Sequence, residues 1–112
     1  MDYRQVSDDF AVAGQITAED IQAIKAAGFK SVICNRPDEE QPGQPPHGGI
    51  QAAAEAAGLA FAYIPVVSGQ ITQRNVVDMA DALDELDGPV FAYCRSGARS
   101  TNLYMMAKQS RG

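Results

Sequence analysis

The sequence has 112 residues, the length of one domain, and we expect a single domain over residues 1–112. Hydrophobic residues make up 46% and charged residues 21%, which excludes a disordered tail and a coiled coil. The net charge of −5 argues against a nucleic-acid-binding surface, which would be basic. No apolar stretch approaches the ~20 residues that span a bilayer, and the first residues lack a secretory-signal pattern. We therefore expect a cytoplasmic domain without membrane contacts.

The first part of the chain predicts two short strands and a helix. The strands lie within residues 2–13 and are separated by a turn over residues 7–9. Thr17 is the expected N-cap of a helix over residues 18–27, and Gly28 is its expected C-terminal cap. A mostly buried strand follows over residues 29–34 and ends at Cys34.

The rest of the chain alternates strands with helices. Residues 35–49 are rich in proline and glycine, and a loop of this length is either functional or mobile. We expect helices over 50–57, from Thr72 to Leu86, and over 100–108, with strands over 59–67 and 89–93. This order predicts an α/β fold: a central, mostly parallel sheet with helices on both faces. Ligands bind such sheets at the carboxyl ends of the strands, where both Cys34 and Cys94 lie.

The segment Cys94-Arg95-Ser96-Gly97-Ala98-Arg99-Ser100 carries the strongest functional signal. A cysteine leaves a buried strand, a short loop follows, and a helix begins. In such a loop successive backbone N–H groups face inward, and the helix N-terminus adds partial positive charge. The loop is therefore predicted to bind an anion and to stabilise a thiolate at Cys94.

Each residue of this anion-binding loop has an expected role. Gly97 permits the tight curvature, Arg99 is suited to bind an oxyanion through two parallel hydrogen bonds, and Ser100 caps the helix while it donates to the sulfur. Arg95, Ser96 and Ala98 supply backbone N–H groups. The alternative is a buried structural cysteine with arginines on the surface.

Loop length separates two enzyme classes that use such a loop. Protein tyrosine phosphatases place five residues between the cysteine and the arginine, whereas only four, residues 95–98, intervene here. The tighter loop resembles that of rhodanese-type sulfurtransferases, in which the cysteine carries a persulfide. Phosphatases also need an acid for the leaving group, and residues 66–70 contain no carboxylate. Tyr93 replaces the histidine that usually precedes the phosphatase nucleophile.

Nearly the whole chain resembles the phosphatase-like domain of beta-lactamase-hydrolase-like proteins, a family also described as sulfurtransferases. The resemblance rests on residues 10–16, the Asn35-Arg36-Pro37-Asp38-x-Glu40 segment, residues 53–59, Ile64-Pro65-Val66, Gly88-Pro89 and the Cys94 loop. It implies a tyrosine-phosphatase-like fold with the Cys loop between the last strand and the last helix. It also implies that Cys94 carries sulfur, and that a persulfide dioxygenase or a sulfide-oxidising enzyme is a partner.

Our functional prediction is a thiol-based sulfurtransferase. The Cys94 thiolate takes a sulfane sulfur from thiosulfate or a low-molecular-weight persulfide, and passes it to a thiol, sulfite or cyanide. The alternatives are a cysteine-dependent phosphatase of the tyrosine or dual-specificity type, and a non-catalytic persulfide or anion sensor. We expect no metal and no organic cofactor.

Three further residues are candidates for accessory roles. Cys34 is either a resolving thiol or second sulfur carrier, or a small buried strand residue. Arg36 either braces the anion-binding loop or adds positive charge to the site, or it pairs with Asp38 or Glu40 at the surface. Asp38 is the only nearby candidate for the acid that a phosphatase mechanism needs. The alternative is that Asp38 only forms a turn. His47 is expected to be exposed to solvent.

Overall fold

The computed structural model describes residues 1–111 and confirms the α/β architecture. Its five strands are β1 (Tyr3–Ser7), β2 (Phe10–Ala13), β3 (Ser31–Cys34), β4 (Ala60–Tyr63) and β5 (Val90–Tyr93). They form one sheet in the order β1-β2-β5-β3-β4. Only β1 is antiparallel to its neighbour, so the sheet is mostly parallel.

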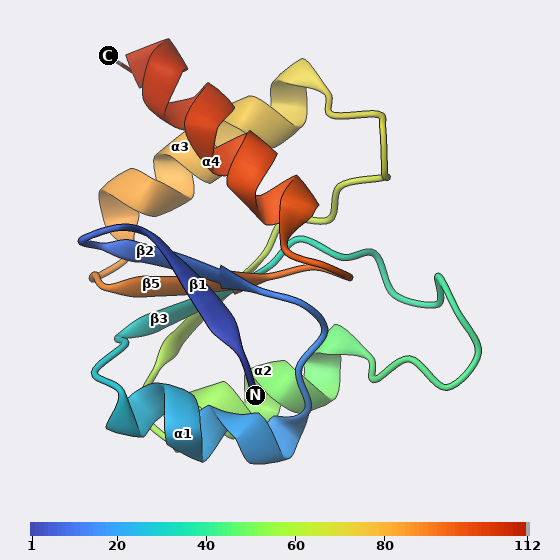
Figure 1. The fold of residues 1–112 in the computed structure, drawn as a ribbon, viewed down its shortest axis with the longest axis vertical. Helices are drawn as coiled ribbons and strands as arrows, with labels where there is room; N and C mark the ends of the chain where they lie inside the picture. The colour runs from blue at the N-terminus through green and yellow to red at the C-terminus, as the bar shows by residue number, and fades with distance from the viewer. Residues whose placement is uncertain (112) are drawn as a thin grey trace.

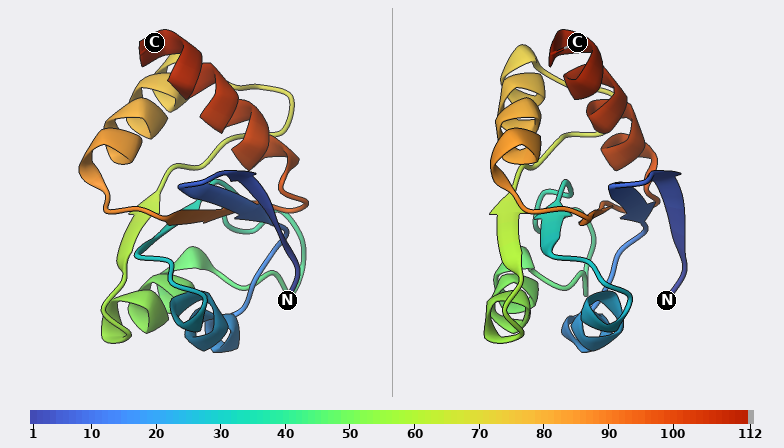
Figure 2. Two further views of the ribbon diagram at one scale, coloured as in Figure 1. Left: turned by 60° about the vertical axis from the view of Figure 1, so that its left-hand side comes forward. Right: turned by 90° about the vertical axis from the view of Figure 1, so that its left-hand side faces the viewer.

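Helices cover both faces of the sheet (Figures 1 and 2). The short 3-10 helix η1 (Ala18–Asp20), α1 (Ile21–Ala26) and α2 (His47–Ala56) lie on one face. The helices α3 (Gln73–Glu85) and α4 (Ala98–Arg111) pack together on the other. Within residues 1–111, no helix is long and apolar enough to cross a membrane.

Each face of the sheet has its own hydrophobic core because side chains alternate along every strand. On β5, Val90 and Ala92 pack toward α3 and α4, whereas Phe91 and Tyr93 pack toward α1 and α2. The alternation directs the next residue, Cys94, toward the α3 and α4 side. The parallel register brings the carboxyl ends of β2, β3 and β5 to one edge, where Ala13, Cys34 and Tyr93 align.

Several predicted element boundaries differ from the structure by two or more residues, and two of the differences have a clear physical cause. The helix expected from Ile50 begins earlier, at His47, because the carboxylate of Asp38 accepts a hydrogen bond from the His47 backbone N–H at 2.9 Å. This contact comes from nine residues upstream, so the local sequence does not reveal it. The strand expected over residues 59–67 ends at Tyr63, shortly before Pro65, which has no N–H for the sheet.

The packing of α4 predicts the stability cost of a core substitution. Leu103 is fully buried between α4 and the sheet, and α4 also carries Arg99 and Ser100. We expect Leu103→Ala to lower the free energy of unfolding by about 2–5 kcal/mol, because the cavity does not collapse fully. Chemical denaturation measures the change. A loss below about 0.5 kcal/mol, typical of exposed sites, would contradict this packing.

Candidate functional site

The loop from Cys94 to Gly97 connects β5 to α4 at the carboxyl edge of the sheet. Its first residue is still held by the sheet, since the Cys94 N–H donates to the Ala13 carbonyl at 3.3 Å. Gly97 has a φ of 95°, a left-handed conformation that glycine adopts without strain. The chain reverses there, and its N–H groups turn inward ahead of α4. The predicted strand-loop-helix geometry of the motif is therefore present.

The Cys94 sulfur is surrounded by hydrogen-bond donors. The Gly97 N–H points at Sγ with an N to S distance of 3.0 Å. Burial raises the pKa of the Cys94 thiol, but the N–H groups of Ser100, Ser96 and Gly97 lower it, as does the Ser100 hydroxyl, and the net pKa lies below the ordinary value. Ser100 lies in the first turn of α4 rather than at its cap, and its Oγ is buried and makes no hydrogen bond within residues 1–111. The loop thus stabilises a thiolate.

A pocket of about 340 Å³ lies over this loop. It is lined by Glu40, Gln41, Ser68, Arg95, Ser96, Ala98 and Arg99. Cys94 itself is fully buried and lies outside the lining. The sulfur therefore lies beneath the loop residues that line the pocket.

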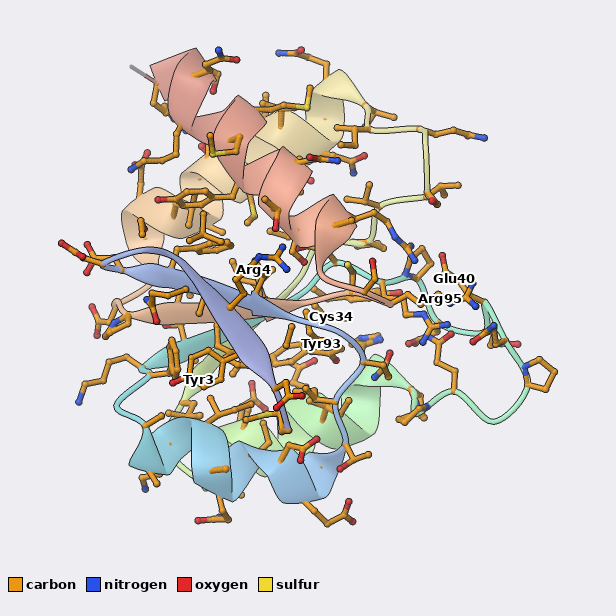
Figure 3. The ribbon with its side chains drawn as sticks, viewed as in Figure 1. Tyr3, Arg4, Cys34, Glu40, Tyr93 and Arg95 are labelled. Carbon is orange, nitrogen blue, oxygen red and sulfur yellow. The ribbon has the colours of Figure 1, made fainter. Side chains whose placement is uncertain are left out.

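Arg99 does not stand free in the pocket, because Glu40 binds it. Nη1 and Nη2 of Arg99 donate to the two Glu40 carboxylate oxygens at 2.7 and 2.9 Å. Nη1 also donates to the Val66 carbonyl at 2.9 Å. Figure 3 shows Glu40 beside Arg95, at the end of the sheet where β5 enters the loop. The loop after β3 and the loop after β5 are thereby joined.

Arg36 binds the same carboxylate from the other side, so the expected pairing with Glu40 forms, although Arg36 is buried rather than at the surface. Its Nε donates to Glu40 Oε1 at 2.8 Å. Its two other nitrogens donate to the side-chain oxygens of Gln15 and Gln41. Hydrogen bonds to Arg99 and Arg36, with burial opposing them, lower the pKa of Glu40 to about 2.

Asp38 turns away from the Cys94 loop toward α2. Its Oδ1 accepts the His47 backbone N–H, and its Oδ2 lies 2.7 Å from His47 Nδ1. Burial raises the pKa of Asp38, but its contacts with His47 lower the pKa by more. The carboxyl group is therefore ionised at neutral pH. The expectation of an exposed His47 was wrong: its ring stacks on Tyr63 at 3.6 Å and is half-buried. Asp38 accepts the N–H of His47 at the start of α2, and this contact holds the His47 ring against Tyr63.

Cys34 lies on the strand next to β5, as expected, but faces the opposite side of the sheet from Cys94. It is paired in register with Tyr93, and both side chains belong to the core beneath α1 and α2 (Figure 3). Its Sγ donates to the Arg36 carbonyl at 3.3 Å, and burial raises the pKa of the thiol. The sheet therefore separates the two sulfur atoms.

Sequence reasoning missed several residues that complete the site. Glu40 was considered as a surface partner of Arg36 and as the end of the segment over residues 35–40 that carries the family resemblance, but no role in the site was predicted for it. The contribution of Gln15 and Gly14 gave no local signal, because they meet the Cys94 loop across the sheet edge. The Gln15 N–H donates to the Arg95 carbonyl at 3.3 Å. Within residues 1–111, no group of three or more ligating side chains gathers to hold a metal.

Solved structures with the same fold define the class of protein. A candidate phosphatase from Neisseria meningitidis is 31% identical, with a TM-score of 0.86 over 97% of this chain and 78% of its own. The protein Tk-PTP, solved in a mutant form, is 13% identical and shares the fold alone, with a TM-score of 0.66 over 97% of this chain and 82% of its own. The fold and the Cys94 loop thus define a cysteine-based enzyme of the tyrosine-phosphatase-like class.

The chain belongs to the family described as the phosphatase-like domain of beta-lactamase hydrolase-like proteins, which matches residues 2–110. This confirms the resemblance inferred from the sequence. The beta-lactamase hydrolase-like protein of Agrobacterium fabrum is 38% identical over 104 residues, or 93% of this chain. The chain spans 24% of the length of that relative.

The hydrogen-bond donors around Cys94 predict a thiol that ionises at a lower pH than an ordinary cysteine. The rate of alkylation by iodoacetamide should rise with pH through an inflection below the ordinary thiol pKa of ~8.5. Cys94→Ser should remove this phase, and Cys34→Ser should leave it unchanged because Cys34 is buried on the other face. An inflection at or above ~8.5 would contradict the stabilised thiolate.

The close approach of Gly14 to the Cys94 loop predicts a second effect. A Cβ at position 14 would lie 2.9 Å from the Arg95 carbonyl oxygen, and this backbone atom has little freedom to move. We expect Gly14→Ala to raise the alkylation inflection toward ~8.5 as the loop N–H groups turn away from the sulfur. Gly49→Ala is the control, since a Cβ there meets nothing within 4 Å. Equal inflections in both variants would contradict the role of Gly14.

Proposed function

We propose that the domain is a cysteine-dependent phosphatase in which Cys94 attacks a phosphate monoester bound over the loop. The observation that carries this proposal is the set of N–H groups from Ser96, Gly97 and Ser100 around a thiol of lowered pKa. Membership of a phosphatase-like family and the candidate phosphatase of Neisseria meningitidis support it. It replaces the sulfurtransferase prediction as the first candidate, because the comparisons favour the phosphatase.

The chemistry follows from these groups. The Cys94 thiolate attacks phosphorus, the bond to the leaving oxygen breaks, and a phosphocysteine forms. The loop N–H groups and Arg99 stabilise the charge on the phosphoryl oxygens. Water then cleaves the P–S bond, which releases phosphate and restores the thiolate.

The pocket supplies no proton for the leaving group. Glu40 is the only carboxylate among its described lining residues, and its pKa of about 2 keeps it ionised. General acid catalysis contributes about 100- to 10,000-fold, so slow turnover is expected for alkyl phosphates. The expected substrates are therefore activated aryl phosphates, because their phenolate leaves without protonation.

Sulfur transfer is a second candidate, favoured by the interval of only four residues between Cys94 and Arg99. Thiosulfate is also a tetrahedral dianion. The Cys94 thiolate would attack its outer sulfur, the S–S bond would break, and sulfite would leave with the electron pair and need no acid. The resulting Cys94 persulfide would pass its sulfur to cyanide, a thiol or sulfite. A low-molecular-weight persulfide as donor, and a persulfide dioxygenase or sulfide-oxidising enzyme as partner, belong to this candidate.

One comparison of activities tests the two candidates. The protein is assayed with p-nitrophenyl phosphate and, separately, with thiosulfate and cyanide; Cys94→Ser is the matched inactive control and Cys34→Ser the active one. The phosphatase proposal expects phosphate release that disappears in Cys94→Ser. Thiocyanate formation without phosphate release would overturn it in favour of sulfur transfer. If neither product forms while phosphate still binds, both candidates fail and an anion sensor takes their place.

A further inference from the structure

The hydrogen bonds of Arg99 are divided between two edges of its guanidinium group. A guanidinium carries five N–H donors: one on Nε and two on each terminal nitrogen. Three are used, two by Glu40 and one by the Val66 carbonyl. The edge formed by Nη1 and Nη2 is therefore occupied. One N–H on Nη2 and the N–H on Nε remain, and these form the second edge.

This second edge is free to receive an oxyanion. Nε of Arg99 makes no hydrogen bond within residues 1–111. It is also not one of the fully buried atoms that lack a partner, so it keeps some exposed surface. Arg99 lines the pocket together with Ser96 and Ala98 of the Cys94 loop. Two parallel N–H groups match two oxygens of a tetrahedral anion. Glu40 thus occupies one edge of the guanidinium and leaves the other edge without a partner among the described residues.

The Glu40 carboxylate is itself held rigidly. Its Oε1 accepts from both Arg36 and Arg99, and its backbone N–H donates to the Gln44 side chain at 3.1 Å. Arg36 is 3% exposed, and each of its two terminal nitrogens donates one hydrogen bond, Nη1 to Gln15 and Nη2 to Gln41. A buried arginine anchored at three points fixes the carboxylate, and the carboxylate fixes the Arg99 side chain.

We propose that Glu40, anchored by Arg36, is a positioning residue that aims the Nε and Nη2 edge of Arg99 at an oxyanion above the Cys94 loop. This rests on the proposed function only in requiring that an oxyanion binds there. The opposite role for the same contact is competition, in which the carboxylate occupies the arginine until an anion displaces it. The two roles predict opposite changes in anion affinity when Glu40 loses its charge.

The test compares Glu40→Gln with Glu39→Gln, which makes the same charge change at the adjacent exposed residue. The probe is inorganic phosphate, and the readout is its protection of Cys94 against alkylation. Positioning by Glu40 predicts that Glu40→Gln weakens phosphate binding by about tenfold, as expected when hydrogen bonds to a charged group are lost. Glu39→Gln should bind phosphate as the unmodified protein does. Equal or tighter binding in Glu40→Gln would overturn the proposal in favour of competition.

Two further variants separate positioning from a general loss of structure. Glu40→Asp keeps the charge and should bind phosphate more tightly than Glu40→Gln. Arg36→Lys should weaken phosphate binding less in the Glu40→Gln background than alone, because Arg36 acts through Glu40 and the two effects do not add. Fully additive effects would contradict the chain of contacts from Arg36 to Arg99.

The same experiment separates this inference from the proposed function. Phosphate protection needs no turnover, so a Glu40-dependent protection in a protein without phosphatase activity would leave the positioning role intact. Where turnover occurs, Glu40→Gln should raise KM and lower kcat/KM, while Glu39→Gln changes neither. Normal kinetics in Glu40→Gln would overturn the positioning role and leave the proposed function standing.

Discussion

The Cys94 sulfur carries negative charge more readily than an ordinary thiol because backbone N–H groups face it from the loop and from the first turn of α4, which lowers its pKa. Burial alone opposes ionisation of a thiol, and here the Cys94 side chain has no exposed surface. The donors must outweigh that cost, and they do so only while the loop keeps its shape. The fold on both sides of the sheet serves this requirement: β2 holds the start of the loop, Gly97 reverses the chain, and α4 supplies the last donors.

The long loop after β3 completes the site from across the sheet edge. It contributes Glu40, which joins two arginines that lie 63 residues apart in sequence and would otherwise repel each other. Because Arg36 is buried, the pair with Glu40 is more than a surface contact, and removal of either partner leaves a charge without its counterpart. The same loop sends Asp38 the other way, to begin α2. One segment thus shapes the pocket and starts a helix.

The alternation of apolar strands with helices was sufficient to predict the α/β class, and the Cys94 loop was equally plain in the sequence. These features are local: a buried strand, a glycine at the reversal and a helix directly after it. The role of Glu40 and the placement of His47 could not be predicted in this way, since each depends on a partner brought near by the fold. The position of Cys34 was likewise predicted only in part. Neighbouring strands were predicted for the two cysteines, but the register that turns their side chains to opposite faces is visible only in the structure.

In the proposed chemistry, Cys94 Sγ is the atom that becomes covalently modified when a tetrahedral oxyanion reacts. Acid quenching during turnover, followed by intact-mass and peptide-mass measurement, identifies that atom for an aryl phosphate and for thiosulfate alike. Attack by the Cys94 thiolate predicts an adduct on Cys94 alone, a phosphoryl group with the first substrate or a single sulfur atom with the second. Turnover without modification of Cys94, or an adduct on Cys34, would contradict it.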